Sequence, residues 1–163
     1  APVSQTGTVQ VFPLGYIARG ADYQTGSANA GAGQFVYMRG SNATTVGQMV
    51  ALSNGSAVLL GTVNSASLNN VGVAAGNLSA TNVYGWVQIQ GYCDYLKGGA
   101  TDVGAAGLGC YIVAGTAGYI QSARIQGNRI SGIVFTNTFS QADTSMSVWL
   151  MYPKLLGSSV QFS

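Results

Sequence analysis

The chain contains no histidine and no glutamate, and only 6% of its 163 residues are charged. Without an imidazole there is no Ser-His-Asp or Cys-His catalytic arrangement and no zinc site of the usual kind. The four acids, Asp22, Asp94, Asp102 and Asp143, are scattered along the chain, which argues against a pair of hydrolytic carboxylates. The sequence therefore predicts a protein that is not an enzyme and that has no metal site and no cofactor.

Positive charge is also scarce. Six Lys and Arg residues give a formal net charge of +2, and so few cations form no stripe that could follow a phosphate backbone. No apolar run approaches the roughly 20 residues that span a bilayer as a helix. We therefore expect neither nucleic acid nor membrane as a partner.

Cysteine is rare too, with Cys93 and Cys110 each lying at the edge of an apolar segment. Two buried thiols are one interpretation, because cysteine is among the residue types that are buried most often. A disulfide that closes the glycine-rich segment between them is the alternative. A reactive nucleophile is disfavoured, since no histidine and no dense cationic cluster lies nearby to lower the thiol pKa.

Glycine is abundant instead, with 24 residues, and it interrupts every window in which a helical period of apolar residues could form. Short alternating segments separated by turns such as Ser53-Asn54-Gly55 predict an all-β fold, a compact barrel-like domain of short antiparallel strands. The strands are expected at Thr8–Phe12, Gln34–Arg39, Gln48–Leu52, Ala57–Val63, Val71–Ala75, Val83–Gln90, Cys110–Ala114, Tyr119–Arg124, Ile130–Thr136 and Ser145–Tyr152.

Two of these segments carry a prediction about burial. Within Val83–Gln90, strand alternation places Val87 on one face and both Tyr84 and Trp86 on the other. Within Ser145–Tyr152 nearly every later position is apolar, which predicts that both faces of that strand are covered.

The composition divides the chain into an arm and a domain. Residues 1–45 hold a tract of small residues that is too poor in large apolar groups to bury itself, so they are interpreted as an N-terminal arm and a connecting segment. Residues 46–163 are expected to form the barrel-like domain with a short C-terminal tail. The apolar arm residues Phe12, Leu14, Tyr16 and Ile17 need a surface to lie on. The sequence leaves open whether that surface is the chain's own body or a neighbouring subunit.

The domain shows a weak internal duplication, with similar halves at about 46–107 and 108–152. Each half has a glycine-led strand, a glycine turn into a short strand, a second glycine-containing strand, a spacer and a long strand. The glycines at 47, 55 and 72 match those at 109, 118 and 132, at shifts of 62, 63 and 60 residues. The pattern predicts one domain built from two similar halves.

The second half carries a resemblance to a known family. The succession Gly109-Cys110-Tyr111-Ile112, Gly118-Tyr119-Ile120, Ile130-Ser131-Gly132-Ile133-Val134 and Ser147-Val148-Trp149-Leu150 resembles the capsid cement, or decoration, proteins of tailed bacteriophages. Asn70-Val71-Gly72-Val73-Ala74 and Gly85-Trp86-Val87-Gln88-Ile89-Gln90-Gly91 follow the same progression in the first half. The resemblance covers residues from about 46 to 152 and leaves the first 45 unexplained.

The resemblance implies a compact β-barrel on the outer surface of the virion capsid. Such a protein binds the major capsid protein of an icosahedral head, commonly as a homotrimer, stabilises the shell and carries no catalytic residues. The scarcity of charge points the same way, because a weakly charged surface rich in aromatic residues favours association. The candidate residues for a subunit or capsid interface are Phe12, Leu14, Tyr16, Arg19, Tyr84, Trp86, Tyr152 and Phe162.

Two other classes remain open at this stage. Tyr84 and Trp86 on one strand face could form a stacking platform of a secreted or cell-surface carbohydrate-binding domain, although aromatic residues of this kind also serve as core or interface packing. A pilin-like or shell-forming subunit of another assembly is the third class.

Overall fold

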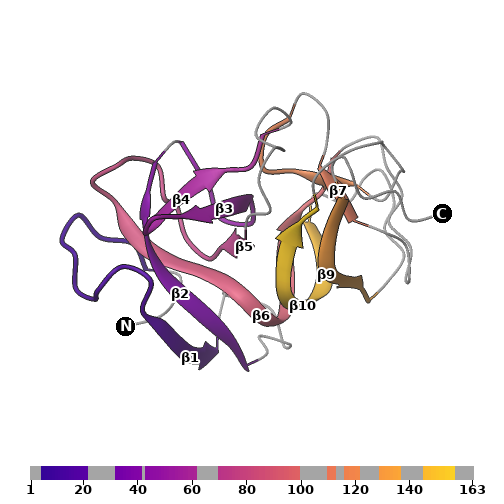
Figure 1. Ribbon diagram of the computed structural model, residues 1–163, viewed down its shortest axis with the longest axis horizontal. Coiled ribbons are helices and arrows are strands. Elements are labelled where there is room, and N and C mark those ends of the chain that lie inside the picture. The colour runs from indigo at the N-terminus through magenta and orange to yellow at the C-terminus, as the bar shows by residue number, and fades with distance from the viewer. Residues whose placement is uncertain are drawn as a thin grey trace.

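The computed structural model is all-β (Figure 1) and describes residues 5–21, 32–41, 43–61, 70–99, 110–112, 116–121, 129–136 and 145–156. These ranges contain no helix, and so none that could cross a membrane. The strands are β1 (Ile17–Ala21), β2 (Ala32–Gly40), β3 (Met49–Ser53), β4 (Ser56–Leu59), β5 (Val71–Ala74), β6 (Tyr84–Lys97), β7 (Cys110–Ile112), β8 (Ile120–Gln121), β9 (Arg129–Phe135) and β10 (Ser145–Leu155).

Most of the strands expected from the sequence are present, with shifted ends. The turn at Asn54-Gly55 is confirmed, because both residues adopt positive φ, 46° and 76°, and Ser53 pairs with Ser56 as in a two-residue hairpin. The strand expected at Thr8–Phe12 was wrong, since this stretch pairs only through one bridge at its neighbour Gly7. Strand β1 was not expected. Val63, residues 113–114 and residues 122–124 lie outside the described residues.

Five strands of the first part of the chain pair in a closed circuit. Strand β2 pairs with β4 in parallel, and β4–β3, β3–β5, β5–β6 and β6–β2 are antiparallel. We call this circuit ring 1. Its inward side chains form one buried cluster, which consists of Val36, Met38, Val50, Ala57, Ala74, Leu78, Val87 and Ile89. The segment 32–40, which composition grouped with the arm, supplies a strand of this ring.

A second circuit uses the far end of β6. This strand has 14 residues, and Gln90–Lys97 pair with β10 while β2 pairs with Tyr84–Gly91. From β10 the sheet continues through β9 and β7 to β8. A parallel bridge between Gly98 and Ile120, with a hydrogen bond of 2.9 Å from the Gly99 N–H to the Ile120 carbonyl, returns it to the end of β6. We call this circuit ring 2. In Figure 1, β6 runs from the side of β2 and β4 to the side of β9 and β10.

The two rings share one plan of strands, although their strands are not divided at the boundaries 46–107 and 108–152. The strand order β4-β3-β5-β6-β2 of ring 1 matches β8-β7-β9-β10-β6 of ring 2. The inward row Val36–Val87–Ala74 corresponds to the inward row Cys93–Val148–Phe135, pair by pair. The shift is 61 residues from Val87 to Val148 and 63 from Ala57 to Ile120. Because the rings share a strand, the sheet is only loosely barrel-like.

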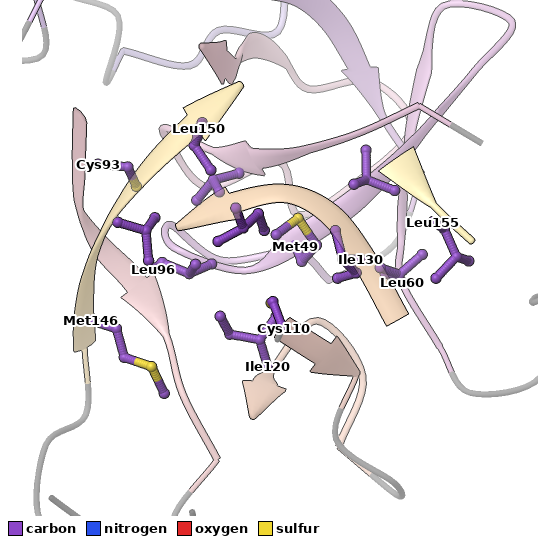
Figure 2. Packing of buried hydrophobic residues seen from close by; sticks show 14 of the residues in the cluster. Met49, Leu60, Cys93, Leu96, Cys110, Ile120, Ile130, Met146, Leu150 and Leu155 are labelled. Carbon is purple, nitrogen blue, oxygen red and sulfur yellow. The ribbon is translucent and has the colours of Figure 1, made fainter. Parts of the chain in front are cut away.

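A large apolar core joins the rings (Figure 2). Met49, Val71 and Val73 point from the outer sides of β3 and β5 into the cluster that also fills ring 2, which includes Ile130 and Leu150. Alternate residues of β3 therefore pack in two different cores. Met49 and Ala51 belong to the cluster that fills ring 2, and Val50 between them belongs to the interior of ring 1. This alternation explains why β3 and β5 are apolar on both faces.

Gln88 lies on β6 just before the residues that pair with β10. Its side chain is fully buried and bonds to later residues of the same strand: Nε2 donates to the carbonyls of Tyr92 (2.9 Å) and Gln90 (3.4 Å), and Oε1 accepts from the Tyr95 hydroxyl (2.6 Å). A buried amide in such a place is stable only because it is satisfied on both sides.

Replacing Gln88 by Leu should lower the free energy of unfolding by about 1–3 kcal/mol, because the Tyr95 hydroxyl and the Tyr92 carbonyl lose their buried partner. Urea unfolding measures the change. Gln90→Leu, at a half-buried position two residues along the same strand, is the control and should change it by less than half as much. Equal losses in both variants would contradict a specific role for Gln88.

Both cysteines belong to the core of ring 2 and are buried, and they are thiols rather than the halves of a disulfide. Figure 2 shows them apart, on different strands. Burial raises the pKa of the Cys110 thiol far above its usual range. The sequence left buried thiols and a disulfide as alternatives, and the structure shows two buried thiols.

The raised thiol pKa gives a pH dependence. The folded chain keeps the Cys110 thiol protonated, whereas in the unfolded chain this thiol loses its proton above its ordinary pKa of about 8.5. Cys110 therefore leaves the free energy of unfolding unchanged below pH 8.5 and lowers it by about 1.4 kcal/mol per pH unit above that value. The free energy of unfolding should therefore decline less steeply between pH 8.5 and 10 in Cys110→Ala than in the unmodified chain. Ellman's reagent should label the thiols only after unfolding. Labelling of the native protein at the rate of the unfolded chain would contradict this account.

Candidate functional site

The arm covers the outer face of ring 1 with a group of aromatic rings. Phe12 lies 5.3 Å from Trp86 and 5.4 Å from Tyr37 between ring centroids, and Tyr16 stacks on Phe12 at 5.4 Å with an interplanar angle of 7°. Tyr37 in turn lies edge-on to Trp86 at 5.1 Å and stacks with Tyr84. The aromatic cluster fixes the arm by apolar contact, because each ring buries a large area.

Backbone hydrogen bonds tie the arm to the same face. Gly7 and Tyr84 exchange two bonds, of 3.0 and 2.8 Å. The Gly15 N–H donates to the Tyr37 carbonyl, and the Tyr37 N–H donates to the Tyr16 carbonyl, both at 2.8 Å. The surface on which the arm lies is therefore the chain's own body.

The outward side of the arm is apolar. Val9 is 70% exposed, Val11 68% and Ile17 54%, and Tyr16 presents about half of its surface beside them. We call these four residues the arm surface. Because Thr8–Phe12 pairs with no strand, its alternating β-branched side chains are left facing solvent.

A second apolar surface lies on ring 2. The expectation that both faces of Ser145–Tyr152 are covered was wrong, since Met146, Val148 and Leu150 point inward and Trp149 is 50% exposed. The outward surface is formed by Tyr92 of β6, Val134 of β9 and Trp149, Met151 and Tyr152 of β10. We call it the ring-2 face. Its centre is the cross-strand row Tyr92–Trp149–Val134, in which the rings of Tyr92 and Trp149 meet edge-on at 5.6 Å.

A bulge in β10 enlarges the ring-2 face. Between the pairs Leu150–Ile133 and Lys154–Ser131, β10 has three residues and β9 has only Gly132. Tyr152 takes a left-handed conformation with φ 49°, so both Met151 and Tyr152 point outward. Gly132 allows this geometry, because a Cβ there would lie 2.6 Å from the Met151 carbonyl oxygen.

The structure brings most, but not all, of the candidate residues expected from the sequence together. The structure brings Phe12, Leu14, Tyr16, Tyr84 and Trp86 together at the aromatic cluster, with Trp86 only 6% exposed. Arg19 is exposed on β1, Tyr152 belongs to the ring-2 face, and Phe162 lies outside the described residues.

Sequence reasoning missed Tyr92, Val134, Trp149 and Met151. The signal was available in the alternation of Met146, Val148 and Leu150 with the residues between them, but a run of apolar residues conceals which face is inward. Tyr37, which packs edge-on to Trp86, was also missed because it comes from a different strand.

One described cation, Lys97, contacts uncharged side chains. Lys97 donates to the Thr45 hydroxyl at 2.6 Å and lies over the ring of Tyr119 at 5.8 Å. Among the residues that the structure describes, no three His, Cys, Asp or Glu side chains gather as metal ligands; Asp102 lies outside them. What the described surface offers is apolar area.

No protein-family model, curated protein or solved structure matches the chain. Its function is therefore inferred from its own residues and surfaces.

Truncating the side chain of Phe12, which packs the arm against ring 1, should release the arm. Phe12→Ala is expected to lower the free energy of unfolding by about 1–2 kcal/mol, less than for a fully buried phenylalanine because Phe12 is 37% exposed. In a Trp149→Phe background the fluorescence of Trp86 should shift to longer wavelength as water reaches it. Val9→Ala, which removes an exposed side chain from the same segment, should change neither value, and identical effects of the two substitutions would refute the anchoring role.

Proposed function

We propose that this protein is a structural component of a virion, which binds the outer surface of an icosahedral phage head and clamps neighbouring major capsid protein subunits. In this proposal it is not an enzyme, its partners are the major capsid protein and further copies of itself, and it needs no cofactor. The resemblance to capsid cement proteins suggests the class, and for the oligomer it suggests a trimer.

The observation that carries the proposal is the arm surface. Val9, Val11, Tyr16 and Ile17 lie on a segment that is tied down on its inner side and left apolar on its outer side. Exposed apolar groups gathered on one element mark a site of interaction. A segment already held against a rigid sheet loses little further entropy on binding, which favours a tight clamp.

The composition supports binding to protein rather than to an ionic partner. With only six cations and four anions in 163 residues, contacts are made mainly by aromatic, aliphatic and uncharged polar groups, which avoid the cost of burying unpaired charges. Such contacts depend little on salt, as suits a permanent assembly.

The carbohydrate alternative has less support. It depends on an open platform at Tyr84 and Trp86, but Trp86 is buried beneath Phe12 and flanked by Tyr37. No described feature favours sugar binding at that position over packing.

The proposal is tested by adding negative charge to the arm surface. Val9→Asp combined with Val11→Asp should reduce binding to phage heads that lack this protein at least tenfold, because two carboxylates would have to be desolvated in the contact. Co-sedimentation with purified heads measures binding, and electron microscopy shows whether the particles are decorated.

The matched control is Ser79→Asp with Thr81→Asp, which adds the same charge at the same spacing on exposed residues outside the arm. It should bind heads like the unmodified chain. Failure of the unmodified protein to bind heads or to raise their resistance to heat would refute the proposal, as would equal binding by both charged variants.

A further inference from the structure

The ring-2 face has a counterpart in ring 1 that is completely covered. In the shared plan of the two rings, the outward row Phe35–Gln88–Val73 corresponds to Tyr92–Trp149–Val134, pair by pair along equivalent strands. Phe35, Gln88 and Val73 are all 0% exposed, whereas Trp149 is 50% and Val134 41% exposed.

The ring-1 row is covered from two sides. Phe35 packs in the cluster of Tyr37, Ala75 and Trp86, whereas Val73 packs into the core that fills ring 2, and Gln88 accepts a hydrogen bond from Tyr95 on the ring-2 part of β6. Part of this row is therefore buried against the other ring, whereas the matching residues Trp149 and Val134 of ring 2 are exposed.

The area of the ring-2 face suits a contact between two copies. Trp149, Met151 and Tyr152 each expose about half of their surface, so with Val134 and Tyr92 they present on the order of 400 Å². A stable interface buries about 800 Å² on each partner, with an apolar centre and a polar rim. The face is large enough to be that centre.

The backbone supports a role in binding. Tyr152 holds a left-handed conformation that is unfavourable for a bulky side chain, and the consequence is to turn two neighbouring apolar residues outward. A β10 strand that only had to fill the core of its own chain could alternate regularly and would not need this bulge.

The charges beside the face have opposite signs at its two ends. Asp94 follows Tyr92 by two positions on β6, and Lys154 follows Tyr152 by two positions on β10, so strand alternation places each on the outward side, with the apolar row between them. A twofold contact centred on Trp149 sets Asp94 of each copy opposite Lys154 of the other. A twofold interface must be self-complementary in this way.

We propose that the ring-2 face binds a second copy of this chain through a twofold contact, with Trp149 and Met151 at its centre and two Asp94–Lys154 pairs at its ends. The contact is independent of binding to phage heads. It makes a dimer of two 16.6 kDa chains, whereas the family resemblance alone suggests a trimer.

Sedimentation equilibrium of the full chain tests the contact. The unmodified protein should be a dimer, and Trp149→Ser combined with Met151→Ser should raise its dissociation constant at least tenfold, as expected for central residues of an interface. Val9→Ser with Val11→Ser removes comparably exposed apolar groups from the arm and should leave the constant unchanged.

A charge exchange tests the geometry without removing apolar area. Asp94→Lys and Lys154→Asp should each weaken the dimer about threefold to tenfold, since each places like charges face to face, and the double variant should regain the original constant. A monomer or a trimer at all concentrations would overturn the proposal. So would a dimer unaffected by the central substitutions, or a double charge variant no tighter than the single ones.

Discussion

One strand belongs to two closed circuits of hydrogen bonds, and the rest of the structure follows from that constraint. The first part of β6 completes ring 1 against β2 and β5, and its second part completes ring 2 against β10. The rings cannot move independently, because both are hydrogen-bonded to one continuous backbone. The buried amide of Gln88 lies near the transition, where it bonds to later residues of β6. The core beside it is continuous with the core of ring 2, so the two rings share one packed interior.

The arm and the ring-2 face both result from strands that are apolar on both sides. A sheet whose strands are apolar on both sides must cover its outer faces, or leave them for a partner. Ring 1 covers Trp86 with Phe12 and Tyr16 of its own arm and covers Val73 with ring 2. Ring 2 presents Trp149 to the outside instead. The same side-chain chemistry is thus core in one half and surface in the other.

Much of the fold could be predicted from local patterns. Glycine at nearly every turn, the Asn54-Gly55 hairpin and the alternation around Val87 indicated short antiparallel strands, and the repeated glycines indicated two similar halves. The candidate site was predicted only in part. Phe12 was recognised as an arm residue that needs a surface, and Tyr84 and Trp86 as neighbours on one strand face, but the contact of Phe12 with Trp86 was not predicted. The Thr8–Phe12 segment was mistaken for a strand because its β-branched residues alternate without any partner to pair with. Trp149 and Met151 were assigned to the interior because a continuous apolar run carries no mark of direction.

The sequence by itself determined the fold class of the protein, which is all-β. With no histidine, no glutamate and few charges, it lacks the groups for common hydrolytic chemistry and must be stabilised by apolar packing between glycine-rich turns. Only the tertiary structure decided which apolar residues are core. Burial depends on which strands lie above and below a face, and these come from positions far apart in the chain, as Phe12 does over Trp86. The bulge at Tyr152 likewise depends on β9 supplying a glycine opposite it, a condition that no local pattern in β10 records.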